Sequence, residues 1–188
     1  SRHSIQSSSD QGDYRLYASI ASGCMSVITP EQCAAWTYPL EKDNADGVVF
    51  NMVTALLMRI HLSGQLAQLS PEHFALVKEA LDLYKGSIRA DLPQGLPFWP
   101  LGMPTFQSSW VSLGMQCGET TYLAVWRCNG DDAQCSLTLP DFVRRDKELQ
   151  AACIYPSGTQ NDWQWDAGSG TLQIELPNQY SARLYRFV

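Results

Sequence analysis

The stretch LPQGLPFWPLGMP, residues 92–104, separates two parts of the chain that have different residue periodicity. Proline has no backbone N–H and fixes φ, so a segment this rich in proline and glycine cannot continue a helix or a central strand. We therefore predict a linker at residues 93–104. It would join a first domain at residues 1–92 to a second at residues 105–188.

The first part has the pattern of an α/β unit. The spacing of apolar residues predicts a short helix over residues 12–23 and a buried strand over residues 34–38. A second helix is predicted over residues 47–62, with Asp46 as its N-cap and Gly64 as its left-handed C-cap.

The clearest single element is a helix that begins after Ser70. Ser70 is a favoured N-cap residue, and Pro71 suits the first helical position, where no backbone N–H is needed. One apolar stripe then follows at helical spacing: Phe74, Val77, Leu81 and Tyr84.

Beyond the linker, apolar and polar residues alternate in short runs. Leu172, Ile174 and Leu176, for example, alternate with polar residues, as expected for a strand with one wet face. Seven strands are predicted, at residues 110–116, 121–128, 136–139, 150–155, 162–166, 171–176 and 181–187. This spacing is typical of an antiparallel β-sandwich.

Composition excludes several classes of function. The chain has 188 residues, is 45% hydrophobic, and carries a formal net charge of −6 without a basic stripe. Nucleic acid and anionic membrane are therefore not expected partners. No apolar run is long enough to span a bilayer. No phosphate loop, dinucleotide fingerprint, nucleophile elbow or metal-ligand cluster is present, so no cofactor is expected.

The six cysteines do not form a CxxC pair. Cys128 and Cys135 flank a turn-rich segment, and a disulfide across a hairpin is one interpretation. The alternative, which we favour, is a pair of buried or half-buried thiols in a reducing compartment. We accordingly expect a cytoplasmic protein.

Five segments of the chain resemble one enzyme family. They are SRHSIQSSSDQGDYRLY (1–17), PEQCAAWTYP (30–39), VVFNMVTALLMRIHLSGQL (48–66), LPFWPLGMP (96–104) and TYLAVWR (121–127). In this order they resemble the C-terminal part of the α-galactosidases of glycoside hydrolase family 36. The resemblance covers nearly all of residues 1–127.

The resemblance implies an α+β fragment of a larger enzyme. Residue 1 would fall at the sixth strand of a (β/α)8 barrel. Residues 1–92 would be the C-terminal part of that catalytic barrel, and residues 105–188 the closing antiparallel β-sandwich. An N-terminal remainder would carry the nucleophilic Asp and a sugar-binding motif, so the isolated chain is expected to be inactive. The open edges of half a barrel also favour a homo-oligomer.

The resemblance assigns a catalytic role to Asp10. In the family, a general acid/base Asp follows the sixth strand in a setting like Ser8-Ser9-Asp10-Gln11, and barrel enzymes place reacting groups at the carboxyl ends of strands. The alternative is that Asp10 is the N-cap of the following helix. Asp13 is the competing carboxylate, and the helix dipole accounts for it.

Trp36 and Tyr38 are the candidate substrate-binding residues. They lie near the expected end of the seventh barrel strand, and aromatic rings stack on the apolar face of galactose. Core packing is the alternative for both. The resulting function is a retaining α-galactosidase that removes terminal α-linked galactose from oligosaccharides. The alternative is a carbohydrate-binding or interaction module whose sandwich uses its tryptophans: Trp99, Trp110, Trp126, Trp163 and Trp165.

Overall fold

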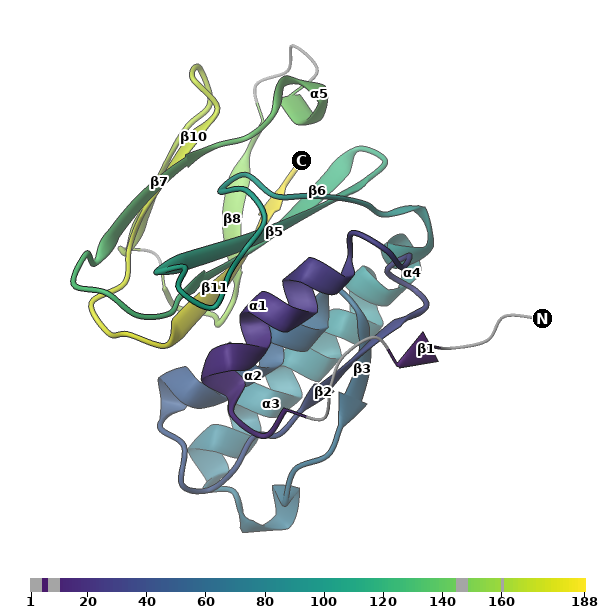
Figure 1. Ribbon diagram of the computed structural model, residues 1–188, viewed down its shortest axis with the longest axis vertical. Coiled ribbons are helices and arrows are strands. Elements are labelled where there is room, and N and C mark those ends of the chain that lie inside the picture. The colour runs from purple at the N-terminus through teal and green to yellow at the C-terminus, as the bar shows by residue number, and fades with distance from the viewer. Residues whose placement is uncertain (1–4, 7–10, 145–148, 160) are drawn as a thin grey trace.

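The first part of the chain is built on a parallel sheet with strand order β1-β2-β3. Its strands are β1 (Ile5–Gln6), β2 (Cys33–Thr37) and β3 (Arg59–Leu62). Helix α1 (Tyr14–Cys24) connects the first pair and helix α2 (Ala45–Leu56) the second, which makes two consecutive βαβ units. The computed structural model in Figure 1 describes residues 5–6, 11–144, 149–159 and 161–188.

The helix predicted after Ser70 is confirmed. α3 (Pro71–Leu83) begins with the Ser70 hydroxyl accepting a hydrogen bond from the His73 amide at 3.2 Å. The helical segment continues through η2 (Tyr84–Ile88) and α4 (Arg89–Asp91). Val77 is buried as predicted, but Phe74 at the start of the stripe is exposed.

The helix predicted over residues 47–62 is wrong in its second half. α2 ends at Leu56, and residues 59–62 form strand β3. Asn44, rather than Asp46, is the N-cap of α2 and accepts from the Gly47 amide. Gly64 is not a helix cap: a Cβ atom there would lie 2.5 Å from the Pro39 carbonyl oxygen, so close approach of two loops explains the glycine.

The second part is a β-sandwich, and all seven predicted strands are present. The larger sheet has the order β4-β5-β6-β11-β8 and the smaller one the order β7-β10-β9. The strands are β4 (Leu96–Phe98), β5 (Trp110–Cys117), β6 (Thr120–Arg127), β7 (Gln134–Thr138), β8 (Ala151–Tyr155), β9 (Trp163–Asp166), β10 (Thr171–Glu175) and β11 (Ser181–Phe187). Two short helices, η1 (Leu66–Gln68) and α5 (Asp141–Arg144), lie in connections.

The segment predicted to be a linker holds two small elements. η3 (Leu92–Gln94) is a single turn, and β4 pairs with β5 as an edge strand of the larger sheet. The Phe98 ring lies over Gly114, its cross-strand partner, where a Cβ atom would clash with the ring. Proline is tolerated in β4 because the strand lies at the edge of the sheet.

Two hydrophobic cores hold the fold together. The smaller lies between the two sheets of the sandwich. The larger joins α1, α2 and β2 to the inner residues of β5, β6 and β11, and Figure 1 shows α1 and α2 beneath the larger sheet. The two parts therefore share a core.

The tryptophans of the sandwich differ in burial: Trp126 is buried, whereas Trp110, Trp163 and Trp165 are half-buried. Trp126 is 1% exposed. Trp163 packs edge-on against Tyr185 and Trp165 against Phe187, with ring centroids 5.6 and 4.8 Å apart. Trp163 and Trp165 thus pack against the sandwich core, and the alternative of a tryptophan-lined binding face stays an untested prediction.

All six cysteines are free thiols. Burial raises the pKa of Cys128 to about 12 and that of Cys135 to about 11, so both thiols stay protonated and unreactive near neutral pH. The disulfide interpretation is therefore not observed. Among the described residues, no helix is both long and apolar enough to cross a membrane.

The Arg127 side chain connects the loop after β6 to the loop after β10 through hydrogen bonds. Arg127 is a buried residue with an exposed fraction of 3%. One terminal nitrogen donates to the carbonyls of Leu176 and Pro177 at 2.6 and 2.7 Å, and the other to those of Gly130 and Asp131 at 3.0 and 3.4 Å. A single guanidinium thus satisfies four backbone carbonyls.

We expect Arg127→Met to lower the free energy of unfolding by about 2–3 kcal/mol, because the carbonyls lose a charged donor that methionine cannot replace. Urea denaturation measures this. The control is Arg186→Met on β11, where the arginine is half-buried, with an expected change within about 0.5 kcal/mol. Equal losses in the two variants would contradict the role given to Arg127.

Candidate active site

The candidate site lies at the carboxyl ends of β1, β2 and β3. Because these strands are parallel, their carboxyl ends meet at one edge of the sheet, where α/β proteins place functional side chains. The Thr37 hydroxyl points toward α2, where it lies 3.7 Å from the Met52 sulfur. Since side chains alternate along a strand, Trp36 and Tyr38 lie on the face opposite that helix.

Three rings gather on this face and form an aromatic cluster of Trp36, Tyr38 and His61. The Trp36 and Tyr38 rings are stacked, with centroids 6.1 Å apart and an interplanar angle of 14°. His61, the register partner of Trp36 on β3, meets the indole edge-on at 5.0 Å. All three side chains are half-buried.

Two helices hold the backbone of this cluster. The Trp36 amide donates to the Tyr17 hydroxyl of α1 at 2.8 Å. The Tyr38 amide donates to the Asn51 side-chain oxygen of α2 at 3.4 Å, and the Asn51 side-chain nitrogen donates to the Gly47 carbonyl at 3.1 Å. The positions of Trp36 and Tyr38 are therefore fixed from behind the sheet.

The Trp36 indole N–H is buried and has no hydrogen-bond partner among the described residues. The ring also packs against the larger hydrophobic core, as the core-packing interpretation expected. A buried donor without an acceptor is costly, and a ligand hydroxyl is one group that would satisfy it. Packing and binding are thus compatible roles for this residue.

Asp10 lies outside the described residues. Its two competing interpretations can be judged from Asp13, which is the N-cap of α1 and accepts from the Arg15 amide at 3.0 Å. The cap position of this helix is therefore taken by Asp13. The Arg15 side chain also donates to the Asp13 carboxylate at 2.8 and 2.7 Å, and these hydrogen bonds lower the pKa of Asp13. A carboxyl group held ionised in this way is a poor proton donor.

The Asp13 contacts predict a dependence of stability on pH. Its pKa is lowered in the folded state, so the ion pair stabilises the fold above the unfolded-state pKa of about 4, and this contribution is lost as pH falls through the folded-state pKa. We expect Asp13→Asn, which keeps an N-cap side chain, to cost a few tenths of a kcal/mol near pH 7, and this difference should shrink as pH falls from about 4 through the folded-state pKa of Asp13.

Urea unfolding at a series of pH values measures this difference. Asp13→Ala is the companion variant and should cost about 1 kcal/mol, because it loses the cap as well. A gap between Asp13→Asn and the native chain that widened toward low pH would have the wrong sign for this interaction.

His61 was missed because residues 59–62 were assigned to a helix. Ile60 and Leu62 pack against the larger hydrophobic core, while Arg59 is exposed. This alternation is typical of a strand, and the same alternation of polar and apolar residues is visible in the sequence. Among the described residues, no group of three or more His, Cys, Asp and Glu side chains could hold a metal ion.

Comparison with solved structures defines the fold. No family model matches the sequence, and no curated protein matches it. The fold of the chain is similar to that of the C-terminal part of α-galactosidases of glycoside hydrolase family 36.

Two structures of this kind are representative. The galactosidase domain of the α-galactosidase–sucrose kinase AgaSK has a TM-score of 0.68 at 18% identity, over 96% of this chain and 25% of its own. A variant of the family 36 α-galactosidase AgaA from Geobacillus stearothermophilus, in complex with raffinose, has a TM-score of 0.69 at 13% identity, over 95% of this chain and 25% of its own. The chain thus spans about a quarter of the length of these enzymes.

The similarity extends beyond galactosidases. An α-amylase from Anoxybacillus has a TM-score of 0.52 at 11% identity, over 95% of this chain and 46% of its own. At these identities the likeness concerns the fold. The sugar that is recognised must be argued from the site.

Proposed function

We propose that this chain is the C-terminal portion of a cytoplasmic, retaining α-galactosidase of glycoside hydrolase family 36, acting on terminal α-linked galactose in oligosaccharides. The observation that carries the proposal is the joint architecture: parallel strands with connecting helices, then a β-sandwich, alike over 95–96% of the chain to family 36 enzymes. The five sequence segments support it independently.

In this proposal the parallel strands are the last three of a (β/α)8 barrel. Parallel sheets are normally covered on both faces. The aromatic cluster of Trp36, Tyr38 and His61 lies on the face opposite α2, where an N-terminal remainder would close the barrel. The remainder would supply the nucleophilic carboxylate, so the isolated chain is inactive.

Asp10 is the general acid/base in this mechanism. A retaining glycosidase needs two carboxyl groups about 5–5.5 Å apart. In the first step Asp10 gives its proton to the glycosidic oxygen while the nucleophile attacks the anomeric carbon and the aglycone leaves. In the second step Asp10 takes a proton from the water that attacks the same carbon and releases galactose and the nucleophile. A nearby carboxylate would raise the pKa of Asp10 in the free enzyme and suit it to the first step.

The aromatic cluster is the proposed wall of the galactose pocket. Trp36 or Tyr38 would stack on the apolar face of the sugar. The backbone amides of Trp36 and Tyr38 are hydrogen-bonded to Tyr17 and Asn51 on the helices. The wall of the pocket is therefore preorganised before the sugar binds.

The first test compares the 188-residue chain with the intact protein that contains the upstream barrel strands. Only the intact protein should release galactose from raffinose, and neither should release glucose from maltotriose. Hydrolysis of raffinose by the 188-residue chain alone, or a preference for maltotriose, would contradict the proposal.

The second test concerns Asp10→Ala in the intact enzyme. We expect kcat/KM for raffinose to fall by about 10²–10⁴-fold, because its leaving group needs a proton. An aryl galactoside with an acidic phenol should be affected far less in the first step, and azide should then speed turnover. Asp13→Asn is the matched carboxylate control and should leave both activities intact. Equal losses on both substrates, without azide rescue, would remove Asp10 from the chemistry.

The third test is Trp36→Ala in the intact enzyme. Both substrates present the same galactose to the proposed wall, so KM should rise about tenfold or more for raffinose and for the aryl galactoside alike. This pattern differs from that of Asp10→Ala, which separates the two substrates. An unchanged KM for both would assign Trp36 to packing alone.

A further inference from the structure

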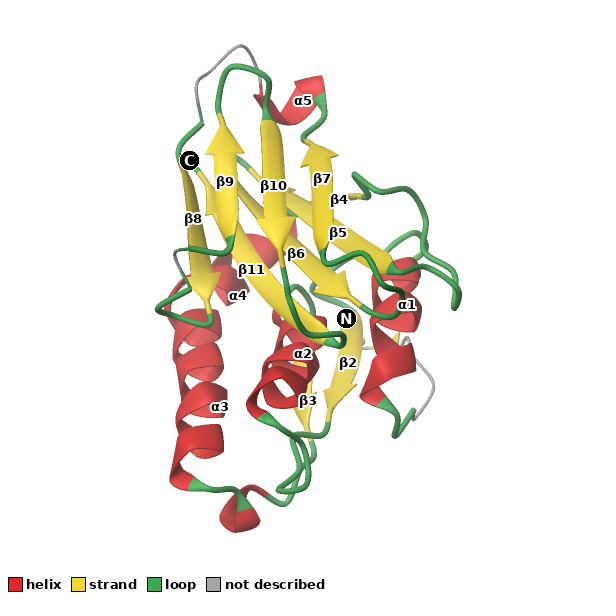
Figure 2. Cartoon of the chain, turned by 90° about the vertical axis from the view of Figure 1, so that its left-hand side faces the viewer, coloured by secondary structure: helices red, strands yellow, loops and turns green. Residues whose placement is uncertain are grey.

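A groove of about 550 Å³ lies over the outer face of the smaller sheet of the sandwich. This sheet, β9-β10-β7, faces the viewer in Figure 2. The exposed polar side chains that line the groove are those of Asp132, Gln134, Ser136, Asn161, Gln164, Gln173 and Glu175. Along β10, the exposed Gln173 and Glu175 alternate with residues that are buried in the sandwich core.

The strand register aligns these side chains in two rows. Gln173 lies directly opposite Gln164 on one side and Ser136 on the other. In the next row Gln134 donates from its amide nitrogen to the Glu175 carboxylate at 3.4 Å. The side-chain amide groups of Gln164 and Gln173 make no hydrogen bond to any other described residue. Their donors and acceptors are therefore available to a ligand.

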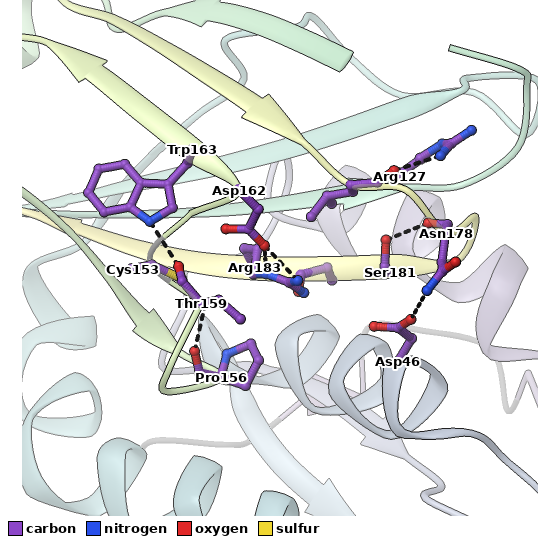
Figure 3. A network of polar contacts seen from close by, with 12 residues as sticks. Asp46, Arg127, Cys153, Pro156, Thr159, Asp162, Trp163, Asn178, Ser181 and Arg183 are labelled. Atoms are coloured by element: carbon purple, nitrogen blue, oxygen red, sulfur yellow. Dashed lines mark hydrogen bonds and ion pairs between the residues drawn. The ribbon is translucent and has the colours of Figure 1, made fainter. Parts of the chain in front are cut away.

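One wall of the groove is rigid. Figure 3 shows the Asp162 carboxylate facing the Arg183 guanidinium, with oxygen–nitrogen distances of 2.9 and 2.7 Å. The Trp163 indole donates to the Thr159 carbonyl at 3.0 Å, and the Glu175 amide donates to the Asp162 carbonyl at 2.7 Å. The Arg183 and Asp162 side chains are only 11% and 19% exposed, so this wall is fixed before any ligand arrives.

The chemistry of the lining selects a neutral, hydroxyl-rich ligand. Each amide offers a donor and an acceptor, which is what adjacent sugar hydroxyls require. No Lys or Arg is among the described residues that line the groove, and the carboxylates of Asp132 and Glu175 disfavour anions. The volume is that of a small-ligand site, large enough for two or three sugar units.

We propose that this groove binds a neutral oligosaccharide through the amides of Gln164 and Gln173. The site is on the opposite sheet of the sandwich from the one that contacts α2, and it does not depend on the proposed hydrolase activity. Trp163 does not serve as a stacking platform, because its ring packs on Tyr185 inside the sandwich. Hydrogen bonds therefore carry the recognition.

The test is a titration of the ¹⁵N-labelled 188-residue chain, followed by NMR. Raffinose and maltotriose are the neutral probes, and trigalacturonate is the anionic one. The side-chain amide resonances of Gln164 and Gln173 should shift with a neutral trisaccharide and not with trigalacturonate. The double variant Gln164→Ala/Gln173→Ala should weaken this binding by about tenfold or more.

A matched control exists on the same face. Thr138 and Thr171 are also directly opposed, with hydroxyl oxygens 3.1 Å apart, and they lie outside the groove lining. Thr138→Ala/Thr171→Ala should leave binding unchanged. If the double glutamine variant does not fold, Gln173→Glu tests the same point, because it keeps the side-chain length but removes the donor and adds charge.

Three results would overturn the proposal. One is an equal loss of binding in the glutamine and threonine variants. Another is sugar-induced shifts confined to Trp36 and Tyr38, which would support the proposed active site and not the groove. The third is a shift of the groove amides that follows protein concentration without sugar, which would place a second copy of the chain there.

Discussion

The fold depends on the complete burial of helix α2. Every residue from Gly47 to Leu56 is buried, so this part of the helix has no solvent-exposed face. A helix that is apolar on all sides must be enclosed by other elements. Here it contacts β2 and β3 of the parallel sheet on one side, α1 and α3 at its flanks, and β6 and β11 of the sandwich on the other. Neither part of the chain can bury α2 alone.

Hydrogen bonds between the helices and the sandwich fix how the two parts of the chain are oriented. The Tyr155 hydroxyl donates to the Leu76 carbonyl of α3 at 3.2 Å, and the Trp99 indole donates to the Ser22 carbonyl of α1 at 3.1 Å. At the start of α2, the Asn178 amide donates to Asp46 at 2.9 Å, as Figure 3 shows. Hydrophobic burial is non-directional, whereas these hydrogen bonds fix the sandwich in one orientation on the helices.

The sequence was informative where one local rule dominated. Ser70-Pro71 marks a helix start and the alternation of residues 171–176 marks a strand, and both elements are where these rules place them. It failed where two rules overlapped. The buried α2 runs on through Leu57 and Met58 into β3 without a polar break, so helical spacing was extended over a strand. The tryptophans posed a similar problem, because composition alone does not distinguish an aromatic core from an aromatic binding face.

The candidate site illustrates the same limit. Trp36 and Tyr38 were found because they end a recognisable strand, but His61 joins them only through the register of β2 with β3. Tyr17 and Asn51 accept hydrogen bonds from the backbone of the cluster. Both lie in helices, and the spacing of apolar residues in these helices does not predict those hydrogen bonds. Contacts between distant segments of the chain are set by packing, and a local pattern does not encode them.

The burial of α2 also connects the sandwich to the candidate active site. Asn51 accepts from the Tyr38 amide, while Phe50, its neighbour in α2, meets Tyr180 next to β11 with ring centroids 6.5 Å apart. Adjacent residues of one helix thus hold the aromatic cluster and contact the sandwich. Because a close-packed interior transmits displacement, a shift of the sandwich would move α2 and, through Asn51, the backbone at Tyr38. The sandwich is therefore part of the support of the site, although its strands lie on the far side of the helix.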